Sequence, residues 1–210
     1  MDKFLLFRSY LTSIDDCLEL KTPNLNLVRT REYCHSTKDK FFKYHRNDVQ
    51  DNRRFALPIT NETGEHDDSS FIGLRGSGLH EMSFVKKTQH YYASGLDKYL
   101  DIFGEDLGRT HIINTKSGGI FAPHRDGPLI DYPLEETFRL LLCIDHCDKH
   151  EMHFTLENSK VLPLHTGKAY FINTMKLHSQ VSFHDDCFFL VANIRISENS
   201  ISLLDSLTVK

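Results

Sequence analysis

The sequence predicts an α+β protein whose core is a double-stranded β-helix of jelly-roll type, buttressed by helices from the N-terminal half. The second half contains short β-rich runs, each ended by Gly, Pro, Asn or Asp, with no helical pattern between them. The first half instead carries apolar residues at helical spacing. The β-rich runs span residues 109–115, 137–145, 153–164, 169–174, 180–183 and 187–196. We therefore expect a mixed N-terminal segment, residues 1–104, packed on a core, residues 105–210, within one structural domain.

The beginning of the N-terminal segment is expected to be helical. From Leu5 to Leu20, apolar residues recur at mixed three- and four-residue spacings, as on one face of an amphipathic helix. The helix should end near Pro23, because a residue before proline is disfavoured in helical conformation. Residues 24–52 show no clean period, and their structure stays open.

The rest of the N-terminal segment is expected to contain a strand, a loop and a second helix. Residues 54–60 have the composition of a short strand, which Pro58 restricts to an edge or a bent position. The polar and acidic residues 61–70 predict a surface loop, as a plain connector or as a lid over a site. Residues 96–103 have helical apolar spacing, and Gly104 is placed to end that helix.

Composition is that of a soluble globular protein. The chain has 210 residues, a hydrophobic fraction of 40% and a charged fraction of 26%, enough for one domain with a proper core. A net charge of −4 argues against a nucleic-acid partner, which would call for a basic face. Five scattered cysteines and a four-residue apolar run near the N-terminus predict reduced thiols, no export, no membrane span and a cytoplasmic location. The oligomeric state is not indicated.

The motif with chemical content is His124-Arg-Asp126. In an extended chain residues i and i+2 leave from the same face, so this imidazole and carboxylate can reach one ion. A third ligand is predicted at His178, which lies in an apolar, strand-like segment 178 − 126 = 52 residues further on. Two imidazoles and one carboxylate form the facial triad of non-haem iron(II) sites, which leaves positions open for substrate and oxygen.

With these motifs in place, the chain resembles the iron(II)/2-oxoglutarate-dependent oxygenases, and more narrowly the branch of aspartyl/asparaginyl β-hydroxylases and free-proline hydroxylases. The resemblance covers residues 105–196. It rests on an apolar strand, a glycine-rich bend, Pro-His124-x-Asp126, a strand carrying Arg139, and a Gly-x-x-x-Phe-x-Asn run that leads to His178. The resemblance implies iron(II), 2-oxoglutarate as cosubstrate and O2, with hydroxylation of a free or peptidyl amino acid and release of succinate and CO2.

The resemblance also implies a cation that anchors the diacid cosubstrate. Arg139 and Arg195 are joint candidates, because arginine binds carboxylates through two parallel hydrogen bonds. The resembling branch has an arginine about ten residues after the distal histidine, and this chain has none there. Substitution of the true anchor should raise the 2-oxoglutarate requirement and leave metal binding nearly intact. Asn114 and Tyr170 are further candidates for hydrogen bonds to the cosubstrate. The alternative is that both are ordinary polar residues of the core.

Three alternatives stay open. A zinc site at Cys143, His146, Cys147, His150 and His153 is disfavoured, because the spacing lacks the CxxC pairs of structural zinc sites. The same His-Asp-His triad would also serve a metal-binding cupin-like protein without oxygenase turnover, a sensor or an isomerase. The last alternative is an interaction protein that has lost its metal, against which the intact triad argues. Substrate identity is not indicated.

Overall fold

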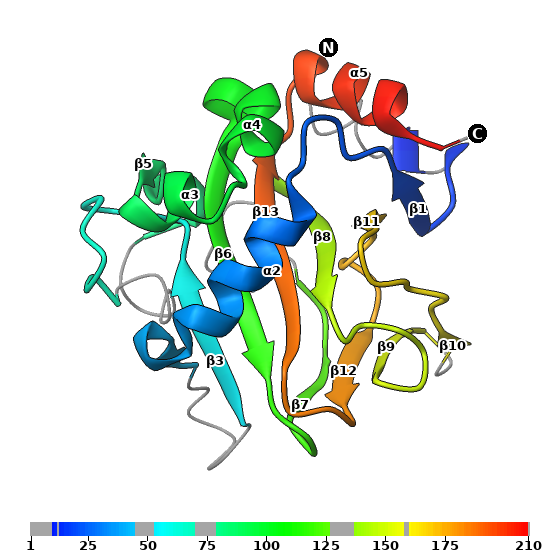
Figure 1. The fold of residues 1–210 in the computed structure, drawn as a ribbon. Coiled ribbons are helices and arrows are strands. Elements are labelled where there is room, and N and C mark those ends of the chain that lie inside the picture. The colour runs from blue at the N-terminus through cyan, green and yellow to red at the C-terminus, as the bar shows by residue number, and fades with distance from the viewer. Residues whose placement is uncertain are drawn as a thin grey trace.

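The computed structural model describes residues 10–11, 13–44, 53–69, 79–126, 137–157 and 160–209. Two antiparallel sheets form its core (Figure 1). The large sheet has the order β1-β11-β8-β13-β6-β3-β2 and the small sheet the order β10-β9-β12-β7. Within the described residues, the strands of these two sheets are β1 (Cys17–Leu20), β2 (Phe42–Lys43), β3 (Arg54–Pro58), β6 (Leu107–Thr115), β7 (Ile120–His124), β8 (Thr137–Asp145), β9 (Met152–Leu156), β10 (Lys160–Val161), β11 (Ala169–Ile172), β12 (His178–Ser182) and β13 (Cys187–Arg195).

Helices and a short hairpin surround this core. Helix α2 (Leu27–Ser36) crosses the outer face of the large sheet (Figure 1). The remaining described elements are η1 (Lys38–Lys40), β4 (Thr60–Asn61), η3 (Glu81–Ser83), β5 (Lys86–Lys87), α3 (Gln89–Ala93), α4 (Asp97–Leu100), η4 (Asp101–Asp106) and α5 (Glu198–Leu207). No helix within the described ranges has both the length and the apolar composition that a membrane crossing requires.

The predicted fold class is confirmed. The strand 137–145 has the predicted bounds, and β6, β11, β12 and β13 lie within two residues of theirs. The predicted run 153–164 divides into β9 and β10, which pair antiparallel. The jelly-roll prediction succeeded because turn residues separate nearly every pair of consecutive strands. The positions of Gly, Pro, Asn and Asp were therefore as informative as the β-rich segments between them.

The core lies in two layers, one on each face of the large sheet. Along β13, Phe188 and Leu190 belong to the layer under the helices. The alternate residues Phe189 and Val191 belong to the layer between the two sheets. Successive side chains of a strand point to opposite faces, so a strand covered on both faces needs apolar residues at every position. This accounts for the nearly continuous apolar run of β13.

The N-terminal helix prediction was wrong at its C-terminal end. Residues 17–20 form β1, which pairs antiparallel with β11, and only residues 10, 11 and 13 are helical among those described before it. The expected residues 5–9 lie outside the described part of the chain. The spacing of a short apolar run does not distinguish a helix from a strand. Here the segment is a strand because it pairs with β11, about 150 residues further along the chain.

Other N-terminal predictions agree better with the structure. The strand expected at residues 54–60 is present as β3, which ends at Pro58 and lies between β6 and the two-residue β2. The strand β2 pairs only with Phe55 and Ala56, so Pro58 lies beyond that pairing, as its missing N–H requires. The predicted helix 96–103 appears as α4 and η4, and Gly104 has a positive φ of 51°. Residues 17–58 thus add three strands to the large sheet, while the division at residue 104 stays a prediction.

The C-terminal helix α5 was not predicted. Ser197 caps it, with its hydroxyl accepting from the Ser200 N–H while Ser200 Oγ accepts from the Ser197 N–H. Leu204 and Leu207 are buried, and Lys21 N–H donates to Leu207 O at 2.8 Å, which ties the helix to the end of β1. The capping serine was a readable signal for this helix.

The buried His90 of α3 makes fold stability depend on pH. Burial lowers its pKa to about 4, with the charges of Lys40 and His66 contributing. Below about pH 6.5 this imidazole is protonated in the unfolded chain but stays neutral in the folded chain. The free energy of unfolding therefore falls as the pH drops from 6.5 towards 4. At pH 5 we expect the unfolding free energy to be lower by about 2 kcal/mol on account of this residue.

Urea unfolding of the wild type and His90→Gln at pH 7.5 and pH 5 measures the contribution of His90 to the pH dependence of stability. The variant should show a smaller loss between the two pH values. His165→Gln, which changes a largely exposed side chain, should lose as much as the wild type. An equal loss in all three proteins would contradict the prediction.

Candidate metal centre

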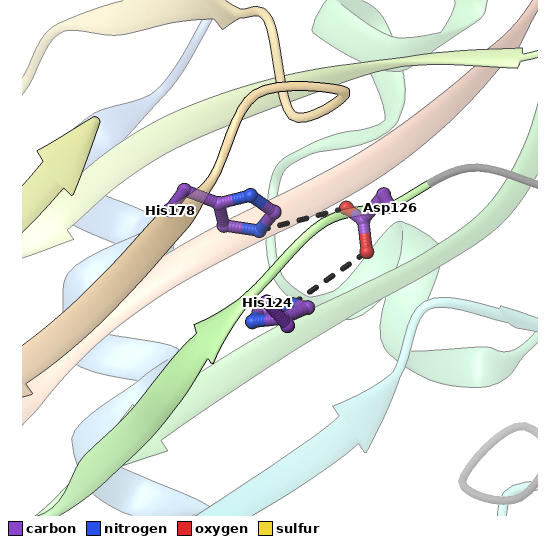
Figure 2. A group of neighbouring side chains, drawn as sticks. All are labelled: His124, Asp126 and His178. Atoms are coloured by element: carbon purple, nitrogen blue, oxygen red, sulfur yellow. Dashed lines mark ion pairs between the residues drawn. The ribbon is translucent and has the colours of Figure 1, made fainter. Parts of the chain in front are cut away.

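His124 and His178 are neighbours because β7 and β12 pair. His124 ends β7, His178 begins β12, and the register places them opposite each other. The Asp126 N–H donates to Thr174 O at 2.9 Å, which continues the ladder past His124. Figure 2 shows the three side chains converging from these two segments. The same-face relation expected for His124 and Asp126 is therefore seen in the structure.

The ligand atoms of the three residues lie close together. The distance from His124 Nε2 to Asp126 Oδ1 is 3.6 Å, and from His178 Nε2 to Asp126 Oδ2 it is 3.7 Å. One ligand atom from each residue lies within 4.8 Å of the other two. The side chains are 14%, 19% and 4% exposed in chain order, so the open side of the group is narrow.

Backbone carbonyls set the tautomer of both histidines. His124 Nδ1 lies 2.8 Å from Ala122 O, and His178 Nδ1 lies 3.0 Å from Lys176 O. A carbonyl oxygen only accepts, so each neutral ring carries its proton on Nδ1 and has its lone pair on Nε2, facing Asp126. This is the arrangement of metal-binding histidines, whose second nitrogen donates to a fixed acceptor.

Aromatic rings hold the two imidazoles in place. The Phe121 ring packs edge-on against His124 at a centroid distance of 4.0 Å. The Phe154 ring lies parallel to His178, at 5.8 Å and an interplanar angle of 3°. Rings packed in this way restrict imidazole rotation, so the two Nε2 atoms are oriented before an ion binds.

Electrostatics favour the metal-binding protonation states. Burial alone would raise the Asp126 pKa, but the Arg139 guanidinium and the two imidazoles outweigh it and hold that pKa below its usual value. Burial lowers the His178 pKa, against the opposing charge of Asp126. Both shifts favour the deprotonated ligand, so the group is ready for a cation at neutral pH.

The donor set fits iron(II). Two imidazole nitrogens and one carboxylate oxygen on one side of an ion leave further positions for exogenous ligands. A structural zinc site would use four protein ligands, and the triad has three. Within the described ranges, the other group with similarly close donor atoms is the exposed run Glu65, His66 and Asp67.

A pocket between the two sheets opens onto the triad, with Asp126 and His178 in its wall. Its volume is about 90 Å³. One part of the wall is apolar and comes from both sheets: Ile113, Leu141, Phe154, Ile172, Phe189 and Val191. Another part is cationic, with the guanidinium groups of Arg54, Arg109 and Arg139 around His111. Burial, followed by these three charges, holds the His111 pKa far below its usual value.

Arg139 lies in this wall, beside Asp126. Its Nε is 3.0 Å from Asp126 Oδ2, and its Nη2 donates to Glu81 Oε1 at 3.1 Å. It lies on β8, the strand after the HxD motif, which is where the cosubstrate arginine was expected. Because the guanidinium also contacts Asp126, we expect substitution of Arg139 to disturb the metal-binding carboxylate as well, and not to leave metal binding nearly intact.

The other three predicted cosubstrate residues lie outside the pocket wall. Arg195 has the pocket-side parity, opposite Thr137, but at the strand end its Nη2 donates to Glu105 O at 3.1 Å. Asn114 alternates with the pocket residues His111 and Ile113 and so faces away. The Tyr170 hydroxyl accepts from the His165 N–H at 3.0 Å, deep in the inter-sheet core.

Four pocket or pocket-adjacent residues were not predicted: Arg54, Glu81, Arg109 and His111. Arg109 and His111 lie two residues apart on the buried strand β6 and therefore share a face. Two charged or titratable residues on one face of a buried strand are unusual, and this pattern could have indicated a polar site. Glu81 and Arg54 had none, because their positions depend on which elements pack together.

The zinc alternative finds no support in the geometry. Cys147 Sγ lies 3.9 Å from Cys187 Sγ in the core, whereas the adjacent His146 points elsewhere, with Nδ1 donating to Glu151 Oε1 at 2.8 Å. Residues 143–153 are not among the close donor groups of the described chain.

Comparisons with known proteins support the fold. The chain matches no protein-family model and no curated protein sequence. Among solved structures it is similar to a prolyl-4-hydroxylase from Pseudomonas putida, with a TM-score of 0.54, 12% identity, and 88% of this chain and 95% of that chain covered. It is also similar to an oxidoreductase of the 2OG-Fe(II) oxygenase family from Burkholderia pseudomallei, with a TM-score of 0.52, 12% identity, and 93% and 89% covered.

A third similar structure is a viral collagen prolyl hydroxylase from Paramecium Bursaria Chlorella virus-1, with a TM-score of 0.50, 10% identity, and 90% and 99% covered. At these identities the likeness concerns the fold. Fold and site together define the chain as a double-stranded β-helix protein with a two-histidine, one-carboxylate group between its sheets.

Proposed function

We propose that the protein is an iron(II)- and 2-oxoglutarate-dependent dioxygenase that hydroxylates a free or peptidyl amino acid and releases succinate and CO2. The observation that carries the proposal is the convergence of ligand atoms from His124, Asp126 and His178, with Asp126 and His178 in the wall of a pocket. The names of the similar structures, two prolyl hydroxylases and one 2OG-Fe(II) oxygenase, support it. The amino-acid substrate class follows from those names and from the sequence resemblance.

His124, Asp126 and His178 would hold the metal through one atom each. When bound, iron(II), 2-oxoglutarate and O2 supply the oxidative decarboxylation and the C–H oxidation, so the protein needs no nucleophile of its own. Its tasks are to orient the three ligands, bind a diacid and exclude water.

The cationic part of the pocket wall suits a dicarboxylate. Arg139 would contact the cosubstrate beside the metal, and Arg54 would contact it from β3. The Arg54 guanidinium is held between two rings, 3.8 Å from the Phe121 centroid and 4.9 Å from that of Tyr44, which fixes its plane. A guanidinium in a fixed plane loses little entropy when it binds a carboxylate. The apolar walls would keep water from the reacting centre.

Anaerobic addition of iron(II) and 2-oxoglutarate to the apoprotein tests the proposal. A weak visible charge-transfer band should appear, and admission of air should release succinate, including slow release without a primary substrate. Metal binding without the band and without succinate would instead support the cupin-like sensor or isomerase. Absence of metal binding would contradict both. A turnover screen of free amino acids and short peptides then addresses the substrate.

Replacing Arg54 with lysine should raise the 2-oxoglutarate concentration for half-maximal decarboxylation by about tenfold, the cost of one charge-assisted hydrogen bond. Lysine keeps the charge but loses the forked geometry, so the 2-oxoglutarate requirement should change more than the iron(II) affinity, which depends on the three ligands. Succinate release at varied 2-oxoglutarate measures this. Arg195→Lys is the control, since Arg195 lies outside the pocket wall. A larger effect at Arg195 than at Arg54 would contradict the assignment.

A further inference from the structure

Four charged side chains, of which Arg109 and Glu81 are buried and Arg139 and Asp126 half-buried, form a chain that ends at the carboxylate of the proposed metal site. Arg109 binds Glu81 through two contacts, Nε to Oε2 at 2.6 Å and Nη2 to Oε1 at 3.0 Å. Glu81 Oε1 also accepts from Arg139 Nη2 at 3.1 Å. Arg139 Nε then lies 3.0 Å from Asp126 Oδ2. The order Arg109, Glu81, Arg139, Asp126 alternates in sign, and each member touches the next.

Glu81 is built into this position. It begins η3, which is capped by His80 through a hydrogen bond from Met82 N–H, and its side chain is 5% exposed. The turn packs directly on β6 at Gly108. A Cβ on that residue would lie 2.6 Å from Met82 Sδ and 2.9 Å from Glu81 O, so a larger residue would push η3 away. Glycine at 108 therefore allows Glu81 to reach the two arginines.

The chain of charges also orients the Asp126 carboxylate. Its Oδ2 is held by Arg139 and lies 3.7 Å from His178 Nε2, while Oδ1 lies 3.6 Å from His124 Nε2 (Figure 2). A carboxylate bound at one oxygen cannot rotate freely, so both of its oxygens keep their positions relative to the two imidazoles. Without a negative charge at 81, the Arg109 and Arg139 guanidinium groups would repel each other across a buried gap, and Arg139 would be displaced from Asp126.

We propose that Glu81 is a positioning residue of the metal centre, which fixes the Asp126 carboxylate through Arg139 and does not itself touch the ion. The inference rests on the metal site of the proposed function and not on oxygenase turnover. Its expected consequence is a 10- to 100-fold change in metal affinity, about the size seen when a partner behind a metal ligand is removed.

Cobalt(II) titration of the apoprotein under anaerobic conditions, followed by visible absorption, tests the proposal. Glu81→Gln should bind cobalt(II) about 10- to 100-fold more weakly than the wild type. At saturating cobalt(II) its d–d spectrum should differ, because the carboxylate is no longer held in one orientation. Glu62→Gln, a change of an exposed glutamate, should match the wild type in affinity and spectrum. A role of Glu81 in folding alone would leave the saturated spectrum unchanged.

Glu81→Asp keeps the charge on a shorter side chain, so its affinity should lie between those of the wild type and Glu81→Gln. It decides the question if the glutamine variant fails to fold. Wild-type affinity and spectrum in a folded Glu81→Gln or Glu81→Asp would overturn the inference and leave the proposed function standing. Failure of the wild type to bind cobalt(II) would instead overturn the metal site itself.

Discussion

Replacing His178 with alanine is expected to abolish turnover and to weaken iron(II) binding by more than about a hundredfold, beyond the effect of losing a partner behind a ligand. In the proposed site His178 would supply one of three protein ligands, and its Nε2 is already oriented by the Lys176 carbonyl and the Phe154 ring. Anaerobic metal titration and succinate release measure the two effects. His124→Ala should behave in the same way, because the two imidazoles hold equivalent positions across the β7–β12 pair.

His150→Ala is the matched control. This exposed histidine lies in the Cys143–His153 segment that was considered as a zinc site, and its loss should change neither metal affinity nor succinate release. Metal binding that survived His178→Ala but fell in His150→Ala would move the site to the Cys143–His153 region. Asp126 is a less direct choice, because its carboxylate also binds Arg139, and its removal would leave that guanidinium without this partner.

The grouping of the three side chains was predictable because it depends largely on local geometry. His124 and Asp126 share a face by the two-residue period of an extended chain, whatever the rest of the fold does. The pairing of His178 with His124 needed one further assumption, that the two strands are neighbours in a jelly roll. The structure places them opposite each other in the register.

The surroundings of the triad were not predictable in the same way. Arg195 is on the pocket face of β13, but the face says nothing about the position along the strand, and at its position Arg195 lies beside Asp106. Glu81 reaches Arg139 across 58 residues of sequence through the packing of a short turn on Gly108. Contacts of this kind arise from the assembled fold, and neither periodicity nor spacing reports them.

The two faces of β13 should separate stability from function. Phe188 is fully buried on the face under α2, where it contacts the rings of His35 and Phe41. Phe188→Ala should lower the free energy of unfolding by about 3–5 kcal/mol, the cost of removing a buried phenyl ring. It should leave the cobalt(II) affinity of the folded protein unchanged, because the pocket lies on the opposite face of the strand. Urea unfolding and metal titration in native buffer measure the two quantities.

Phe189→Ala is the companion variant, because the next residue of the same strand lines the pocket. It should lower stability by a similar amount and also raise the 2-oxoglutarate requirement, since an apolar wall of the pocket is lost. Phe183→Ala, at a ring 50% exposed, should change the unfolding free energy by no more than about 0.5 kcal/mol. If Phe188→Ala weakened metal binding as strongly as it weakened the fold, the layer under the helices and the layer around the site would be one cooperative unit, and the separation inferred from strand alternation would be wrong.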